Sequence, residues 1–192
     1  CFNSALEMST GNYIWHQDDD DVIAMDYIEK MVTLFQGNAG CSSASGLVAS
    51  IDAKGNIMKG ENYRSSNYRP RYMPGHILAL DVLKGSRVMY GYPGQIFSFK
   101  RDALLKYGGF HRSYEYHQLH GIAPFGITGF DETAYFYWRR HEEQLNKTLT
   151  AQGWIGTNEI FSLANSLDQE GKWEIYGNDT AKYVVKKIKD DH

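Results

Sequence analysis

This sequence has few cysteines, no long hydrophobic run and only a small net charge. Each of these features argues against a class of protein. Two cysteines among 192 residues cannot form a disulfide framework, which favours a reducing compartment. No run approaches the ~20 consecutive apolar residues of a membrane-spanning helix, and the first residues lack the charged-then-apolar order of a signal peptide. We therefore expect a cytoplasmic protein that at most associates with a membrane surface.

The charge balance argues against a nucleic-acid partner. Lys and Arg number 20 and Asp and Glu 23, giving a net charge of -3, so the protein has no overall basic field for phosphate backbones. A content of 42% hydrophobic and 22% charged residues is typical of a globular domain with a buried core. We expect no nucleic-acid binding and one main domain.

The first part of the chain has the pattern of an α/β protein. Apolar spacing and glycine stops predict a helix over 2–10, a buried central strand at 13–15 and a helix that begins at Asp26 and ends at Gly37. Glu29 stands three residues after Asp26, which is the spacing of a capping box. Further strands are expected at 46–51, 95–100 and 133–138, with a turn at 52–56 and a short helix at 101–107.

Two segments differ from this pattern. Residues 58–94 are rich in Tyr, Arg, Gly, Asn and Ser, show little periodicity and carry three of the four prolines, so we expect a long loop region over a binding face. Beyond residue 150 the apolar spacing becomes helical. We therefore divide the chain into a main domain at 1–150 and a helical extension at 151–192.

Four consecutive aspartates, Asp18, Asp19, Asp20 and Asp21, follow the strand predicted at 13–15. Neighbouring carboxylates repel and raise one another's pKa unless a cation compensates their charge. In an extended segment Asp18 and Asp20 would face one way, and Asp19 and Asp21 the other. Two carboxylates on one side suit Mg²⁺ or Mn²⁺, which bind hard oxygen ligands and phosphate oxygens. We interpret the run as a metal site.

A solvated acidic loop is the alternative interpretation of the run. Negative charge is favoured near the N-terminus of the helix that starts at Asp26. A surface loop, however, needs no apolar strand directly before it, which favours the metal site. An EF-hand is excluded because its sixth position, counted from Asp18, must be glycine and is Ile23.

A basic cluster, Arg139, Arg140 and His141, comes directly after the strand predicted at 133–138. Two guanidinium groups and an imidazole at this place could hold a diphosphate and complete the shell of a metal ion. The alternative is a basic turn on the surface.

The order of these motifs resembles that of glycosyltransferase family 2. The stretch from Asn3 through Gly11, Tyr13 and Ile14 to the aspartate run resembles the family's Asn-containing helix, its strand and its Asp-x-Asp-Asp run. Downstream, residues 46–56 resemble the family's next strand and turn. Residues 97–110 resemble its Arg-containing strand with the helix and Gly-Gly-Phe that follow, and residues 137–141 resemble its closing Tyr-Arg-x-His segment. The resemblance covers roughly residues 1–148.

The resemblance implies an α/β fold of the GT-A type, in which a mixed central sheet flanked by helices binds a nucleotide sugar. It implies that Asp18 contacts the ribose or the sugar of the donor and that Asp20 binds the metal, which would be Mn²⁺ or Mg²⁺. The other residues that it assigns to the site are Asp19, Asp21, Arg139 and Arg140 for the donor and His141 for the metal.

The resemblance also indicates where the catalytic base stands. In the family it is the aspartate of a Glu-Asp pair shortly after Gly-Gly-Phe, and here Tyr114 and Glu115 occupy that place. Glu115 is our candidate base for direct displacement at the anomeric carbon with inversion. His117 and His120 are alternatives.

The family's first β-α-β portion, which holds the base of the nucleotide, has no counterpart before Asn3. We therefore expect this portion to be missing or truncated. An incomplete sheet would expose an edge strand and apolar surface, which favours self-association into a homo-oligomer.

Three functions follow from these patterns. The first is a metal-dependent, inverting glycosyltransferase of polysaccharide biosynthesis, with a UDP-sugar donor and a glycan or lipid-linked acceptor reached through residues 58–94. The second is a non-catalytic carbohydrate-binding or assembly module derived from such an enzyme. The third is a metal-dependent phosphoesterase, for which no hydrolase motif is present.

Overall fold

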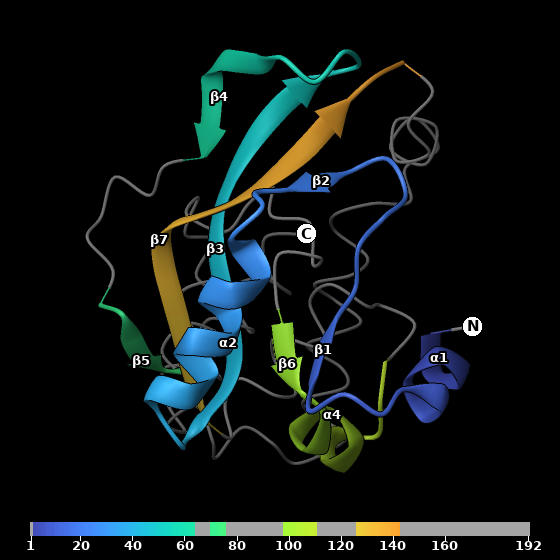
Figure 1. Cartoon of the computed structure of the whole chain (residues 1–192), viewed down its shortest axis with the longest axis vertical. Coiled ribbons are helices and arrows are strands. Elements are labelled where there is room, and N and C mark those ends of the chain that lie inside the picture. Colours follow the sequence, from blue (N-terminus) through green and yellow to red (C-terminus); the bar gives the residue numbers. More distant parts are fainter. Residues whose placement is uncertain (1, 64–69, 76–97, 111–125, 143–192) are drawn as a thin grey trace, which may run out of the picture.

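The computed structural model describes residues 2–63, 70–75, 98–110 and 126–142. These residues form a mixed seven-stranded sheet with helices packed against it (Figure 1). The strands follow the order β1-β6-β3-β7-β2, with β4 paired to β3 and β5 paired to β7. In chain order the elements are α1 (Phe2–Met8), β1 (Tyr13–Trp15), β2 (Val22–Ile23), α2 (Tyr27–Gly37), β3 (Cys41–Asp52), β4 (Ile57–Tyr63), β5 (Tyr72–Pro74), β6 (Ser98–Lys100), α4 (Arg101–Tyr107) and β7 (Ile127–Arg140).

The centre of the sheet is the parallel pair of long strands β3 and β7 (Figure 1). The first half of β3 consists of small residues, which lets β7 come close. A Cβ atom at Gly46 would lie 2.3 Å from the carbonyl oxygen of Ala134, so the contact requires glycine. Because the two strands are parallel, their carboxyl ends meet, and Asp52 is paired with Arg140 at that edge.

Helix α2 covers one face of this pair (Figure 1). Tyr27, Met31, Leu34 and Phe35 are its buried residues, and they join the hydrophobic core that includes Phe136 of β7. Burial of a large apolar side chain stabilises a protein by about 1.5–3 kcal/mol. The four residues therefore fix α2 on the sheet, and with it the chain segment that leads into the helix from the aspartate run.

The central strands are longer than predicted, and part of the predicted loop is strand. β3 begins earlier than 46 because buried serine residues with a weak strand signal precede Gly46. β7 begins at Ile127, earlier than 133, and Thr128 and Gly129 are buried there. β4 and β5 lie in the segment predicted as a loop, so that prediction is wrong for 58–63 and 72–74. Pairing with β3 and β7 fixes these polar segments as strands, which local sequence does not reveal.

Two further predictions are corrected by the structure. In the part of the chain that it describes, β1 pairs only with β6 and its residues are half-buried, so it is not a buried central strand. Asp26 makes no capping hydrogen bond, and no capping box with Glu29 forms. The backbone of Asp26 is nearly helical rather than extended, and its carboxylate instead pairs with Lys30 at 2.7 Å.

The remaining predictions are confirmed or lie outside the described residues. The helix predicted over 2–10 is present but ends at Met8. The stop at Gly37, the turn with Gly55 at a φ of +88° and the helix at 101–107 are present as predicted. The helical extension at 151–192 lies outside the described residues. Within the described ranges the longest helix, α2, has 11 residues, and none has the length and apolarity to cross a membrane.

Candidate active site

The aspartate run lies in the short connection between β1 and β2 (Figure 1). A turn at Asp19 and Asp20 bends the chain, so the segment is not extended. The predicted alternation of faces is therefore wrong in part: Asp18 and Asp20 do come together, but Asp21 joins them. One carboxylate oxygen from each of Asp18, Asp20 and Asp21 lies within 4.8 Å of the others. Asp19 is exposed and is not part of this cluster.

Asp21 is the buried member of the cluster, with 7% of its surface exposed. Its Oδ1 accepts the main-chain N–H of Arg139 at 2.8 Å, and its carbonyl oxygen accepts the side-chain amide of Gln17. Burial raises the pKa of Asp21 to about 6, the hydrogen bond from the Arg139 N–H opposes this rise, and the nearby charges of Asp20 and Asp18 add to it. Burial is thus the main reason that the ionised form of Asp21 is disfavoured, and its acidic neighbours add to the effect.

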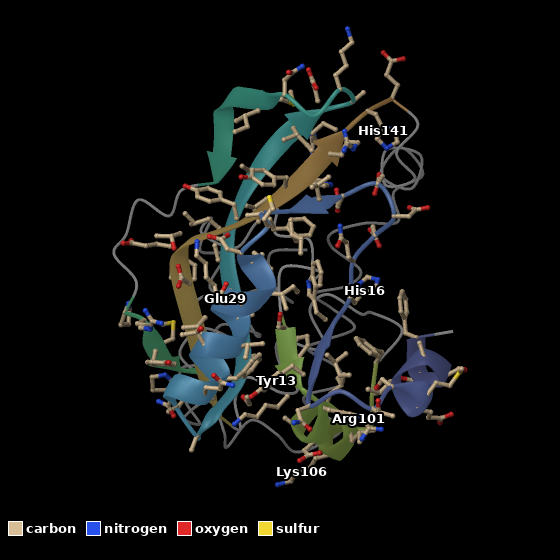
Figure 2. All side chains as sticks on the ribbon, in the orientation of Figure 1. Tyr13, His16, Glu29, Arg101, Lys106 and His141 are labelled. Atoms are coloured by element: carbon tan, nitrogen blue, oxygen red, sulfur yellow. The ribbon has the colours of Figure 1, made fainter. Side chains whose placement is uncertain are left out.

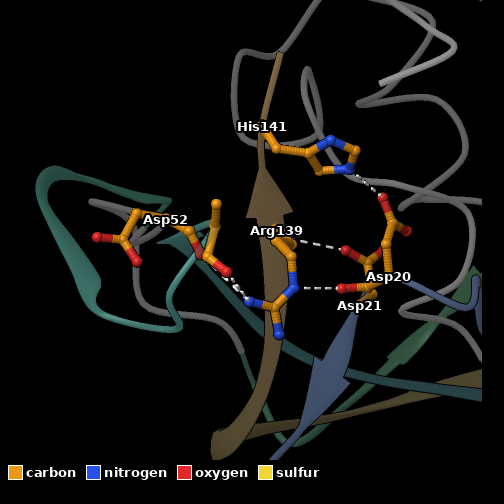
Figure 3. A network of polar contacts seen from close by, with 6 residues as sticks. Asp20, Asp21, Asp52, Arg139 and His141 are labelled. Atoms are coloured by element: carbon orange, nitrogen blue, oxygen red, sulfur yellow. Dashed lines mark hydrogen bonds and ion pairs between the residues drawn. The ribbon is translucent and has the colours of Figure 1, made fainter. Parts of the chain in front are cut away.

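His141 lies beside the carboxylate of Asp20, as Figure 3 shows. It follows the last residue of β7, and its Nε2 lies 2.9 Å from Oδ2 of Asp20. The structure therefore brings together Asp20 and His141, the two residues predicted to bind the metal.

Arg139 and Arg140 are the last two residues of β7 rather than part of a turn after it. Side chains alternate along a strand, so the two arginines project to opposite sides. Arg139 points toward the aspartate loop, where its Nε donates to the carbonyl oxygen of Asp20 at 2.7 Å (Figure 3). The guanidinium carbon of Arg140 lies 4.3 Å from the centre of the Trp138 ring, a cation–π contact. The side chains of Arg139 and Arg140 therefore lie apart, and their joint role at a diphosphate stays a prediction.

His16 is a residue of the site that the sequence patterns did not single out. Its Nε2 lies 3.6 Å from Oδ1 of Asp18, and its ring meets Phe2 edge to face at 4.6 Å between centroids. Burial lowers the pKa of His16, and the charge of Asp18 opposes this shift. A histidine two positions before an acidic run was the available signal.

The segment expected to carry the catalytic base follows the end of α4, where hydrogen bonds from Asn3 hold the chain. Asn3 donates its amide to the carbonyl oxygen of Phe110 at 3.0 Å and accepts the N–H of Phe110 at 2.7 Å. Gly109 has a φ of +86°, and a Cβ there would lie 2.6 Å from Oδ1 of Asn3. The motif residues Asn3 and Gly109 thus attach α1 to the end of α4. Glu115, His117 and His120 lie outside the described residues.

The acidic cluster fits a hard divalent cation. Mg²⁺ binds oxygen at about 2.0–2.1 Å, so two ligand atoms of one ion lie within about 4.2 Å of each other. A spacing of at most 4.8 Å in Asp18, Asp20 and Asp21 needs only small side-chain rotations to reach this. Burial raises the pKa of Asp21, and the charges of Asp20 and Asp18 add to this rise, so a cation at the cluster would favour the ionised form of Asp21. Oxygen donors together with the imidazole of His141 suit Mn²⁺ as well as Mg²⁺.

A family model described as "Glycosyl transferase family 2" matches residues 2–108, which is more than half of the 192 residues. The matched region includes Asn3, the aspartate loop, α2, β3 and α4, whereas Gly109, Arg139 and His141 lie beyond it. No curated protein matches the sequence.

Proposed function

The chain belongs to glycosyl transferase family 2, and from this membership we propose that it transfers a sugar from a nucleotide diphosphate donor to a hydroxyl group of an acceptor. The expected α/β fold of the GT-A type agrees with the family match and with the mixed sheet. We propose a UDP-sugar as donor and a glycan or lipid-linked sugar as acceptor. The observation that supports the proposal most strongly is the convergence of Asp18, Asp20 and Asp21 within the matched region.

The proposed roles follow from the contacts of each residue. Asp20 and His141 hold the divalent cation, Mn²⁺ or Mg²⁺, which when bound supplies positive charge for the departing diphosphate. Asp18 contacts the ribose or sugar of the donor, and Asp21 supports both neighbours from its buried position.

Three further residues remain predicted parts of the donor site. Asp19 is exposed at the turn of the aspartate loop, and Arg140 is the last residue of β7. Arg139 would contribute through its contacts with the aspartate loop.

The proposed reaction is a single displacement with inversion. Glu115 takes the proton of the acceptor hydroxyl as that oxygen bonds to the anomeric carbon. The bond between the anomeric carbon and the diphosphate oxygen breaks at the same time, and its electron pair leaves with the diphosphate. The hydrogen bonds between Asn3 and Phe110 fix the chain just before the segment that carries Glu115.

Calorimetry of the purified protein with UDP, in the presence and absence of Mn²⁺, tests the donor site. We expect UDP to bind only with Mn²⁺, and we expect Asp20→Ala to abolish this binding. Asp102→Ala is the matched control, because Asp102 is an exposed carboxylate in the first turn of α4. Transfer is then followed as release of UDP from a UDP-sugar. If folded wild-type protein bound glycans but neither Mn²⁺ nor UDP, the proposal would be wrong and a carbohydrate-binding module would be favoured.

A further inference from the structure

Arg139 joins two loops that are distant in sequence. Its main-chain N–H donates to Oδ1 of Asp21 at 2.8 Å, and its Nε donates to the carbonyl oxygen of Asp20 at 2.7 Å. On the other side, NH1 donates to the carbonyl oxygens of Asp52 and Ala53 at 3.3 and 3.1 Å. Figure 3 shows the guanidinium group between the two loops. One residue thus connects the acidic loop with the turn between β3 and β4.

The turn on the far side is itself fixed by local hydrogen bonds. The carboxylate of Asp52 accepts the main-chain N–H groups of Lys54 and Asn56 and the side-chain amide of Asn56, each at 2.9 Å. Gly55 completes the turn with a φ of +88° and donates its N–H to the carbonyl oxygen of Asp52 at 3.0 Å. The hydrogen bonds within the turn therefore hold the carbonyl groups that accept from Arg139, independently of Arg139 itself.

The guanidinium group is the side chain suited to this connection. It presents N–H donors in a rigid planar fork, so Nε and NH1 can serve acceptors on different segments at once. In the contacts among the described residues, the acceptors are neutral main-chain carbonyl groups, so these contacts set position more than they neutralise charge. His141, two residues further along, then reaches the Asp20 carboxylate from the same strand end.

From these contacts we propose that Arg139 is a positioning residue, which holds the carboxylates of Asp20 and Asp21 in their binding arrangement by tying their loop to the β3–β4 turn. The inference rests on the proposed function, because it assigns to Arg139 a task in the metal site. It differs from a direct contact with the diphosphate: the bonding of Nε and NH1 to main-chain oxygens directs the guanidinium group away from a ligand and into the protein frame.

Binding of Mn²⁺ alone, without nucleotide, separates positioning from charge. Arg139→Met removes a positive charge near the acidic cluster, so electrostatics alone would make Mn²⁺ bind more tightly. Loss of positioning has the opposite effect, because residues that orient metal ligands typically account for roughly 10- to 100-fold in metal affinity. We expect Arg139→Met to bind Mn²⁺ at least tenfold more weakly, as measured by calorimetry.

Two other variants probe the same connection. A lysine has one point-like donor group and cannot serve both loops in the same way, so Arg139→Lys should weaken Mn²⁺ binding although it keeps the charge. Asn56→Ala changes no charge, and it removes only the hydrogen bond from the Asn56 amide to Asp52. We expect it to weaken Mn²⁺ binding several-fold from the far side of the turn.

The control for charge is Arg101→Met, which removes one positive charge, as Arg139→Met does, together with the hydrogen bond from Arg101 to Ser9 at 3.3 Å. Arg101 lies at the other end of the molecule from His141 (Figure 2). Its Mn²⁺ affinity should equal that of the wild type. Hydrogen exchange on metal-free protein adds a readout without metal: the peptide covering residues 18–24 should exchange faster in Arg139→Met and unchanged in Arg101→Met.

The outcomes are distinct. Wild-type affinity for Mn²⁺ in Arg139→Met, or tighter binding, overturns the positioning role while leaving the proposed function intact. If Arg139→Met does not fold, Arg139→Lys and Asn56→Ala decide, and wild-type affinity in both overturns the inference. Absence of Mn²⁺ binding by the wild type instead overturns the metal site of the proposed function, and the positioning role with it.

Discussion

The side-chain amide of Asn3 exchanges two hydrogen bonds with the main chain of Phe110, 107 residues later in the sequence. An Asn amide offers a donor and an acceptor in the same arrangement as a peptide group, so α1 attaches to the end of α4 much as a strand attaches to its neighbour. Phe2 strengthens the attachment through its ring contact with Phe110, at 5.8 Å between centroids. The same helix, through Phe2 and His16, adjoins the Asp18 end of the acidic loop.

Replacement of Asn3 by alanine tests this attachment. Asn3→Ala removes both hydrogen bonds, and since a net hydrogen bond contributes about 0.5–1.5 kcal/mol, we expect the free energy of unfolding to fall by about 1–2 kcal/mol. Denaturant unfolding measures the change. Ser4→Ala, at the neighbouring exposed position of α1, should have almost no effect. Equal stability of both variants would show that the Asn3 contacts do not hold α1 in place.

Alanine at Gly109 is expected to destabilise the protein more than alanine at Gly55. Both glycines have positive φ angles, of +86° and +88°, so both substitutions force an L side chain into a strained conformation. Only at Gly109 would the new Cβ meet another group, the Asn3 Oδ1 atom at 2.6 Å, whereas it finds open space at Gly55. The difference between the two midpoints of thermal unfolding therefore isolates the close contact. Unfolding of Gly109→Ala and Gly55→Ala at the same temperature would contradict it.

The sequence predicted the parts of the fold that depend on local pattern. The end of the helix at Gly37 and the turn at Gly55 are signalled by a glycine that follows a segment of regularly spaced apolar residues, and the structure contains both. The length of β3 was missed because Ser42, Ser43, Ser45 and Gly46 are buried by their neighbours in the sheet and not by their own hydrophobicity. Tertiary pairing decides such a strand, and a single sequence does not record it.

The sequence likewise predicted only part of the candidate site. The order of the motifs was enough to find the acidic run, the pair of Asp20 and His141, and the positions of Asn3 and Gly109. The convergence of Asp21 with Asp18 could not be predicted, because it depends on the turn at Asp19 and Asp20 in place of an extended segment. The contacts of Arg139 with Asp52 and Ala53 could not be predicted either, because every residue type has a main-chain carbonyl group and the acceptors therefore do not depend on residue identity.

Asp21→Asn should stabilise the metal-free protein at neutral pH. Burial raises the pKa of the Asp21 carboxyl from 3.8 to about 6, so the folded protein holds this proton more tightly than the unfolded chain. Its contribution to stability is therefore most favourable below pH 4 and declines as pH rises through about 6. A shift of about 2 units corresponds to about 3 kcal/mol at most. Asparagine keeps an acceptor for the Arg139 N–H and removes the charge, so the unfolding midpoint at pH 7.5 should rise. A midpoint below that of the wild type would contradict the expectation.

The same proton should compete with the metal. Deprotonated ligands bind metals, so Mn²⁺ affinity should be constant above the pKa of Asp21 and fall up to tenfold per pH unit below about 6. Calorimetric titrations with Mn²⁺ between pH 5 and pH 8 give the profile. In Asp21→Asn we expect weaker binding with a flatter dependence on pH over this range. An identical profile in both proteins would show that Asp21 takes no part in the metal site.

Asp20 and His141 should act as a pair when Mn²⁺ binds. Their side chains lie 2.9 Å apart in the metal-free structure, and both are proposed to contact the same ion. Removal of either ligand leaves an incomplete shell, so the second removal should cost less than the first, and the two effects should not add.

A double-mutant cycle with Asp20→Ala, His141→Ala and the double variant measures this coupling in Mn²⁺ affinity, with Asp131→Ala as the control partner for His141→Ala. Asp131 is a suitable control because its carboxylate accepts hydrogen bonds only from Thr133 among the described contacts. Strict additivity of Asp20→Ala and His141→Ala would mean that the two residues act independently, and the proposal that they share an ion would be wrong.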